Sequence, residues 1–273
     1  MTLQGAATRP LSDNARAAAV RTAPHVTIRG LSKKFSDATI YDNFDFDIPR
    51  GKLMSVFGPN GCGKSTLINM IAGLFPADSG EILFDGQPLN KIKFGYVFQN
   101  YREAVFPWLN AFDNIAYPLK VMGVPKADRN LRVEKIVATL NVKIDLKLYP
   151  YQMSGGQQQL VSIMRALVVD PEILFLDEPF SALDYEMTLF MREQLQRVFQ
   201  ETHTTTVLVS HDLEEAVYLS DRILLLSRHP ARAVEFVHYD APRPRTDKTM
   251  TEADFIQTKA HCLEIFQREV RKG

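Results

Sequence analysis

Short apolar runs separated by polar turns dominate the first hundred residues of the chain. Most runs are continuous over four to seven positions, but residues 43–48 alternate apolar with polar side chains, which is typical of a half-buried strand. The dipeptide Asp85-Gly86 indicates a tight hairpin turn. The pattern predicts strands at residues 25–31, 43–48, 53–57, 81–84 and 94–98.

The spacing of apolar residues becomes helical between residues 100 and 168, which predicts a helical insertion with helices at 111–122, 126–140 and 157–168. Apolar strand patterns return afterwards, and alternating strands and helices imply a parallel sheet with right-handed crossovers. This second part predicts strands at 173–176, 205–209 and 222–226, with a helix at 185–200.

The pattern and composition of the sequence change again near the end of the chain. Alternating apolar residues at 234–238 indicate a last strand, and 241–246 is a linker rich in proline and arginine. Thr249 and Glu252 have the spacing of a capping box. We expect an amphipathic helix that packs on the domain, and binding to a membrane surface is the alternative. The apolar face of this helix would consist of Ile256, Ala260, Leu263, Phe266 and Val270.

These patterns divide the chain into three parts. Residues 1–24 are rich in alanine and arginine and are expected to form a mobile arm. Residues 25–240 form the predicted α/β domain with its helical insertion at about 100–168, and residues 241–273 form the linker and the C-terminal helix.

The sequence GPNGCGKST follows the strand at 53–57 and opens a helical stretch, which is the context of a phosphate-binding loop. Glycines allow backbone N–H groups to converge, and a helix N-terminus favours anions. Lys64 is expected to reach the β- and γ-phosphates, and the Ser65 hydroxyl to ligate Mg²⁺. The expected nucleotide-binding residues are Gly58, Pro59, Asn60, Gly61, Cys62, Gly63, Lys64, Ser65 and Thr66, with Cys62 as a small filler.

The apolar run at 173–176 ends in Asp177 and Glu178. Beside a phosphate-binding loop, Asp177 is suited to hold Mg²⁺, and Glu178 to deprotonate an attacking water. A strand end capped by two solvated acids is the alternative. Gln99 follows a strand, where its amide is suited to touch Mg²⁺ and water, and His211 ends another strand, where it is suited to contact a γ-phosphate or to serve only the structure.

A second anion-binding helix start is predicted at Ser154, Gly155, Gly156 and Gln157. Ser154 is suited to cap the helix, and the paired glycines expose backbone N–H groups. A single γ-phosphate does not require two such sites, so we expect this one to face nucleotide held by a partner subunit.

Together these residues resemble an ATP-binding subunit of an ABC transporter. GPNGCGKST resembles the Walker A motif, ILFLDEP resembles Walker B, MSGGQ resembles the LSGGQ signature, and SALD resembles the D-loop. Gln99 and His211 match the Q-loop glutamine and the switch histidine. Phe35 stands where that family has an aromatic residue that stacks on adenine, with a core phenylalanine as the alternative.

The resemblance implies a P-loop NTPase fold with an antiparallel β subdomain and a helical signature subdomain. It also implies that two cassettes pair head to tail, with ATP and Mg²⁺ bound by Lys64 and Ser65 in cis and the γ-phosphate contacted by Ser154, Gly155 and Gly156 in trans. Asp184 would lie at the dimer interface. The implied partners are a second ATP-binding subunit, as a homodimer or with a related chain, membrane permease subunits at the cytoplasmic face of the inner membrane and, indirectly, a periplasmic solute-binding protein.

The stretch VFPWLNAFDNIAYPL is similar to a pattern of the nitrate, sulfonate and taurine importers, which implies import of small anions. Trp108 within it is interpreted either as a docking contact for the permease or as a core anchor. The chain departs from the usual signature, since Met153 replaces leucine, Gln158 and Leu160 replace arginines, and Gln157 stands where that importer group has methionine.

Composition narrows the alternatives. Lys plus Arg and Asp plus Glu both number 32, so the chain lacks the basic excess of a nucleic-acid binder. Two cysteines do not suggest a disulfide framework, and no apolar run reaches the roughly 18 residues of a membrane span. The remaining alternatives are an exporter or lipid-transport ATPase, a soluble ABC-type ATPase acting on DNA or ribosomes, and a small-molecule kinase.

Overall fold

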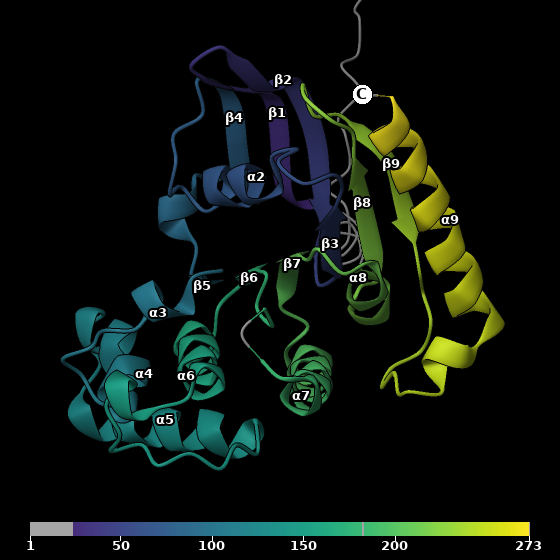
Figure 1. Cartoon of the computed structure of the whole chain (residues 1–273). Helices are drawn as coiled ribbons and strands as arrows, with labels where there is room; N and C mark the ends of the chain where they lie inside the picture. The colour runs from purple at the N-terminus through teal and green to yellow at the C-terminus, as the bar shows by residue number, and fades with distance from the viewer. Residues whose placement is uncertain (1–23, 182, 273) are drawn as a thin grey trace, which may run out of the picture.

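A computed structural model describes residues 24–181 and 183–272 (Figure 1). The predicted N-terminal arm, except Pro24, lies outside the described residues, as does Ala182 of the SALD stretch. The strands are β1 (Pro24–Phe35), β2 (Ala38–Pro49), β3 (Leu53–Phe57), β4 (Ser79–Phe84), β5 (Phe94–Val97), β6 (Ile173–Asp177), β7 (Thr205–Val209), β8 (Arg222–Leu226) and β9 (Ala233–His238).

Over the described residues the strands form two sheets. The smaller one is antiparallel with order β2-β1-β4, and the larger one has order β5-β6-β7-β3-β8-β9. All neighbours in the larger sheet are parallel except β8 and β9. The predicted turn at Asp85-Gly86 is confirmed, with positive φ at both residues, but it joins Phe84 to Gln87 by a single bridge and leads into no hairpin strand.

The larger sheet lies between two hydrophobic cores. One core joins it to the antiparallel sheet and to α2 (Lys64–Ile71), and the other joins it to the helices of the opposite face, including α7 (Tyr185–Thr202) and α8 (Leu213–Leu219). Both faces are therefore covered, which explains why every residue of β3, β6 and β7 is buried and why these strands are mostly apolar.

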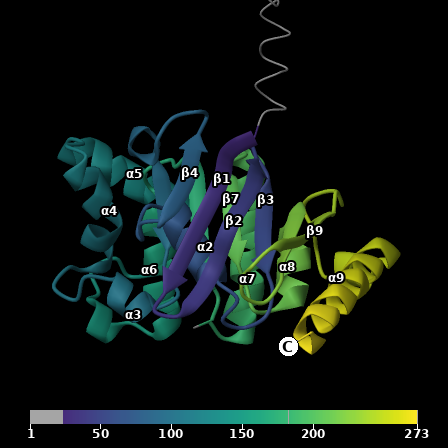
Figure 2. The ribbon, with the colours of Figure 1, turned by 90° about the horizontal axis from the view of Figure 1, so that it is seen from above.

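The predicted helical insertion is confirmed and forms a lobe beside β5 (Figure 1), and Figure 2 shows its helices at the opposite side of the molecule from α9. Its helices are α3 (Tyr101–Ala104), α4 (Ala111–Val121), α5 (Lys126–Thr139) and α6 (Gly155–Leu167). Helix α6 ties this lobe to the sheet, since the backbone of Gly95 in β5 approaches Ala166 so closely that a Cβ there would lie 2.3 Å from the Ala166 carbonyl oxygen. Short 3-10 turns occur at Leu89–Lys91, Pro150–Gln152 and Thr249–Thr251.

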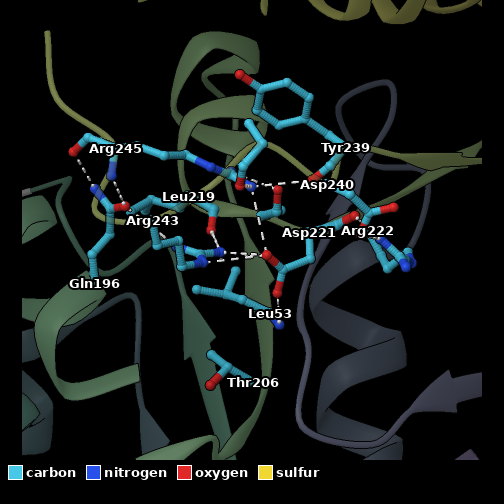
Figure 3. A network of polar contacts seen from close by, with 12 residues as sticks. Leu53, Gln196, Thr206, Leu219, Asp221, Arg222, Tyr239, Asp240, Arg243 and Arg245 are labelled. Atoms are coloured by element: carbon cyan, nitrogen blue, oxygen red, sulfur yellow. Dashed lines mark hydrogen bonds and ion pairs between the residues drawn. The ribbon is translucent and has the colours of Figure 1, made fainter. Parts of the chain in front are cut away.

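The half-buried Arg243 and the buried Arg245 attach the C-terminal segment to the core (Figure 3). Arg243 forms a 2.8 Å ion pair with Asp221, whose other oxygen accepts a hydrogen bond from the Leu53 N–H. Arg245 is about 1% exposed, and its guanidinium donates to the carbonyl oxygens of Val217, Tyr218, Ser220, Tyr239 and Ala241. The predicted linker is therefore a structural anchor for the C-terminal helix.

The predicted capping box at Thr249 is wrong. Thr249 starts a 3-10 turn, and its hydroxyl accepts a hydrogen bond from the Thr246 N–H, while the last helix, α9 (Ala253–Arg271), begins after Glu252. The predicted contact stripe is partly wrong as well. Ile256 and Leu263 are 54% and 41% exposed, because the helix is rotated to bury the face formed by Phe255, Cys262, Ile265 and Glu269.

Helix α9 lies against α8 and β8, so the prediction that the last helix packs on the domain is confirmed. Helix α8, which follows His211, was not predicted, since its seven residues are too few for a periodic signal. None of the helices in the described part of the chain combines the length and hydropathy required to cross a membrane.

Candidate nucleotide-binding site

The carboxyl ends of β3, β6 and β7 open on a cavity of about 530 Å³. Most of the predicted phosphate-binding loop lines it, and residues that follow β6 and β7 complete the wall. The lining residues are Asn60, Gly61, Gly63, Lys64, Ser65, Thr66, Glu178 and His211. The loop therefore faces the predicted catalytic residues across one cavity, at the edge of the sheet where α/β proteins bind their ligands.

Two glycines of the loop occupy positions that no other residue fits. Gly63 precedes α2 with φ of 105°, and a Cβ there would lie 2.7 Å from Ile40 Cγ2. Gly58 passes so close to β8 that a Cβ would lie 2.9 Å from the Leu226 carbonyl oxygen. Cys62 is buried beneath the loop, in agreement with its predicted role as a filler, and burial raises the pKa of its thiol.

Lys64 is 8% exposed and donates two hydrogen bonds to the loop itself, at 2.9 Å to the Gly58 carbonyl and 3.0 Å to the Pro59 carbonyl. A buried ammonium group needs such partners because removing it from water is costly. The two carbonyls hold the cation beside the cavity, where a phosphate oxygen would be a stronger partner.

Ser65, at the start of α2, contacts Asp177 at the end of β6. The Ser65 hydroxyl donates a 3.1 Å hydrogen bond to Asp177 Oδ1. Asp177 is 5% exposed, and burial raises its pKa to about 6, although the hydrogen bond from Ser65 lowers it. A buried carboxylate beside a hydroxyl is an oxygen pair that fits Mg²⁺, because the cation would offset the cost of the buried charge.

Three predicted catalytic residues converge at one carboxylate. Gln99 Nε2 donates a 2.9 Å hydrogen bond to Glu178 Oε2, and His211 Nδ1 lies 3.3 Å from the same oxygen. Gln99 comes from the end of β5 and His211 from the end of β7, so the sheet brings together residues that are far apart in sequence. The carboxylate of Glu178 is partly exposed, as a group that contacts water must be.

The backbone of Glu178 is in the left-handed region, with φ of 47°. Its N–H donates a 2.9 Å hydrogen bond to the Val209 carbonyl at the end of β7. A non-glycine residue in this region is uncommon and persists where the surroundings hold it, often at functional sites. This conformation turns the Glu178 side chain toward His211.

A cluster of polar and charged side chains holds the two residues that flank His211 in the chain. Ser210, immediately before it, donates a hydrogen bond to Glu215 in α8, and Glu215 lies 3.4 Å from Arg192 in α7. Arg192 also lies 3.7 Å from Asp212, which caps α8. Sequence patterns did not single out this cluster, because its members belong to two helices and a loop and have no common spacing.

Phe35 ends β1 and is 45% exposed, so the alternative of a core phenylalanine is wrong. Its neighbour Lys33 pairs with Tyr41, whose hydroxyl donates a 3.0 Å hydrogen bond to the Gly63 carbonyl. Lys33 Nζ also lies 5.2 Å from the Phe35 ring centroid. The antiparallel sheet thus contacts the phosphate-binding loop through Tyr41 and carries the exposed ring of Phe35 on the neighbouring strand, where base stacking stays a prediction.

The predicted helix start at Ser154 is confirmed, while anion binding there stays a prediction. Ser154 caps α6, its hydroxyl accepts from the Gln157 N–H at 3.2 Å, and Gln157 Oε1 accepts from the Ser154 N–H at 2.9 Å. Among the described residues, the lining of the P-loop cavity includes no member of 154–157. Asp184 caps α7 through the Met187 N–H, with its remaining surface exposed.

The departures from the usual signature have structural reasons. Leu160 is 2% exposed and packs in the hydrophobic core of the lobe. Gln158 donates to the carbonyls of Pro150 and Met153, which fixes the segment before Ser154.

A second cavity, of about 770 Å³, lies between the sheet and the helical lobe. It is bordered by Gln99 and by aromatic side chains that include Phe98, Phe106 and Tyr117. Trp108 lies 5.5 Å from Phe106 and is 70% exposed, so the interpretation as a core anchor is wrong. An exposed aromatic patch of this kind is typical of a protein contact surface.

Comparisons with known proteins agree with these features. A family model described as "ABC transporter" matches residues 41–181. The chain is 38% identical over 249 residues to the aliphatic sulfonates import ATP-binding protein SsuB of Bacillus cereus, which covers 89% of this chain and 96% of that protein. It is 41% identical over 213 residues to the sulfate/thiosulfate import ATP-binding protein CysA of Neisseria meningitidis, covering 74% of this chain and 58% of CysA, so it spans less than two thirds of that relative.

Among solved structures, the chain resembles the dimeric, post-hydrolysis state of the ATP-binding cassette MJ0796 bound to ADP and Pi. The TM-score is 0.69 at 27% identity, and the match covers 80% of this chain and 100% of that chain.

Proposed function

The chain belongs to the ABC transporter family as an ATP-binding, ATP-hydrolysing subunit, and from this premise we propose that it drives the import of small anions of the nitrate, sulfonate and taurine type. The names of SsuB and CysA, importers of sulfonates and of sulfate or thiosulfate, support this class of solute. We assign ATP hydrolysis to the P-loop cavity because Lys64, Glu178 and His211 line it.

ATP occupies the P-loop cavity with its phosphates on the loop. Lys64 exchanges the Gly58 and Pro59 carbonyls for phosphate oxygens, and the N-terminus of α2 adds its dipole. Phe35 stacks on the base, a contact that contributes roughly 1–3 kcal/mol per base in other proteins. Ser65 and Asp177, with Gln99 in support, would hold Mg²⁺, which supplies charge neutralisation at the β- and γ-phosphates.

Glu178 acts as the general base. Its carboxylate accepts the proton of the attacking water, a role that typically contributes about 10²- to 10⁴-fold in rate. The Gln99 amide orients the carboxylate through the 2.9 Å hydrogen bond, and His211 stands at the same oxygen, ready to contact the γ-phosphate. The observation that carries the assignment is this convergence of Gln99, His211 and Glu178 opposite Lys64.

Two cassettes complete each site. Ser154, Gly155 and Gly156 lie away from their own P-loop cavity, which supports a head-to-tail pair in which they contact the γ-phosphate bound by the other subunit, with Asp184 at the interface. The dimeric state of MJ0796 supports the same arrangement. Whether the second subunit is a copy of this chain is tested by mass measurement.

A membrane permease docks in the second cavity. The cavity borders Gln99, which contacts Glu178, so a permease segment there touches the residue that orients the general base. The exposed Trp108 flanks it. We place the chain at the cytoplasmic face of the membrane on this argument, with a solute-binding protein acting on the other side through the permease.

The test is transport by the assembled complex in lipid vesicles. ATP turnover should rise when the binding protein loaded with a sulfonate or nitrate is added on the opposite side, and Glu178→Gln should abolish both turnover and uptake. Turnover that responds to lipid or to an outward-moving solute instead would favour the exporter alternative.

A further inference from the structure

A single buried hydrogen bond joins helix α6 to the residue that follows Glu178. Gln159 in α6 is completely buried, and its Nε2 donates a 2.7 Å hydrogen bond to the Pro179 carbonyl oxygen. The Oε1 atom of the same amide has no hydrogen-bond partner among the described residues. The contact to Pro179 is therefore the polar interaction that fixes this side chain, in an environment where an unpaired amide is costly.

Residues 178–181 and 183–184, here called the catalytic loop, are held from two sides. Strand β7 holds the start of the loop through the bond from the Glu178 N–H to the Val209 carbonyl. Gln159 holds the next peptide group, that of Pro179. A left-handed φ such as that of Glu178 persists only where the surroundings determine it, and these two bonds flank that residue.

Helix α6 also touches the other end of the catalytic loop. A Cβ on Gly156 would lie 3.3 Å from Leu183 Cδ2, so the first turn of the helix packs closely on the residue before Asp184. The same turn carries Ser154 at its cap. Helix α6 therefore contacts both ends of the catalytic loop. The tip of this helix would bind the partner's nucleotide, and the catalytic loop would act on the chain's own nucleotide.

We propose that Gln159 is a positioning residue that couples the two nucleotides of the paired cassettes. When the tip of α6 engages the γ-phosphate held by the partner, the helix transmits its position through Gln159 to Pro179, and Glu178 in the same chain is set for attack on the other ATP. This inference rests on the proposed paired function, and it adds a path between the two sites that runs inside one chain.

The first test is the steady-state ATPase activity of the full chain carrying Gln159→Met, which keeps the length and volume of the side chain but cannot donate. We expect kcat to fall by about 10- to 100-fold, the loss typical of a misplaced catalytic group, with KM for ATP within about twofold of the wild type. Gln159→Asn, which keeps the amide but is too short to reach Pro179, should show the same loss.

A matched control is Gln196→Met, since Gln196 is also buried and also bonds backbone, at Arg245, away from the catalytic loop. It should lower the melting temperature and leave kcat within about twofold of the wild type. If Gln159→Met and Gln159→Asn both turn over ATP at the wild-type rate, the proposal is overturned.

The second test separates the two subunits of a dimer purified through two different tags. One subunit carries Glu178→Gln, so only its mate's own nucleotide is hydrolysed. Placing Gln159→Met in the mate should reduce ATP turnover by the same roughly 10- to 100-fold as in the first test. Placing it in the Glu178→Gln subunit should leave ATP turnover unchanged. The reverse result would mean that Gln159 acts on the partner's nucleotide through the helix tip, which overturns the proposal. Failure of the paired function itself would appear separately, as the absence of any dimer with bound ATP.

Discussion

Gln99 and Glu178 are 79 positions apart in the chain, yet the amide of one donates a 2.9 Å hydrogen bond to the carboxylate of the other. Parallel pairing of β5 with β6 brings the two strand ends together. Gln99 also borders the groove between the sheet and the helical lobe, so one side chain contacts both the proposed general base and the proposed docking surface. Through Gln99, a permease segment bound in this groove would act on the proposed general base.

The pairing of Ser65 with Asp177 predicts how metal dependence changes. Ser65→Ala removes a proposed Mg²⁺ ligand and leaves the buried Asp177 without its hydroxyl partner. We expect the Mg²⁺ concentration for half-maximal ATPase activity to rise by at least about tenfold, since even second-layer partners of metal ligands change affinity by about 10- to 100-fold. Ser65→Thr, which keeps the hydroxyl, serves as the control. An unchanged Mg²⁺ titration for Ser65→Ala would remove Ser65 from the metal site.

His25 predicts a pH dependence of folding. Burial, assisted by Arg50, lowers its pKa from 6.5 to about 4, and its Nδ1 lies 2.7 Å from Thr205 Oγ1. Between pH 6.5 and about 4, His25 is therefore protonated in the unfolded chain and neutral in the folded chain. The free energy of unfolding should fall by up to about 1.4 kcal/mol per pH unit as pH decreases from 6.5 toward 4, with no contribution from this group above 6.5.

The measurement is urea unfolding at several pH values for the wild type and for His25→Gln. Subtracting the two series removes the other titrating groups. A difference that is constant from pH 7 to pH 4.5 would contradict the assignment.

Arg245 predicts the strength of the C-terminal anchor. Arg245→Met removes a fully buried guanidinium and leaves the carbonyls of Val217, Tyr218 and Ser220 without their donor. Breaking a buried network of this kind typically costs about 3–5 kcal/mol, and we expect a loss of that order in urea unfolding. Arg132→Met, which breaks an exposed pair with Asp170, should cost less than about 1 kcal/mol. Equal losses would mean that the buried anchor contributes no more than a surface pair.

Trp108 provides a probe of docking because it is the single tryptophan of the chain. We expect its fluorescence to shift to shorter wavelength when permease is added, since its exposed ring would leave water. Trp108→Ala should weaken permease binding by at least about tenfold, as expected for a central aromatic contact, and leave the melting temperature unchanged. Leu131→Ala, at another exposed apolar position, is the control. Transport and assembly at wild-type levels in Trp108→Ala would exclude the docking role.

Sequence patterns predicted most of the fold because its signals are local. Strand β3 is apolar at every position except Ser55, and the helices of the lobe follow a 3.6-residue period, so their positions can be predicted from the chain alone. Gly63 and Lys64 were predictable because a phosphate-binding loop imposes a fixed order of residue types.

The remaining features depend on tertiary contacts. Which face of α9 is buried depends on the contact of Phe255 with Tyr239, and the period of the helix permitted either stripe. The Arg192–Glu215 pair and the Gln159–Pro179 bond join elements whose proximity is decided by the packed sheet. The roles of Phe35 and Trp108 were ambiguous because the sequence does not show whether a single aromatic side chain is buried or exposed. The structure shows that both are exposed.

The proposed site requires two cassettes that enclose ATP between the P-loop of one and the helix tip of the other. Light scattering of the Glu178→Gln protein with Mg·ATP, in the presence of its permease if needed, measures whether that pair forms. We predict an ATP-dependent pair of cassettes, at twice 30.9 kDa for two copies of this chain, and its loss in Glu178→Gln combined with Ser154→Arg. A single cassette at saturating Mg·ATP, or a pair indifferent to Ser154→Arg, would contradict it.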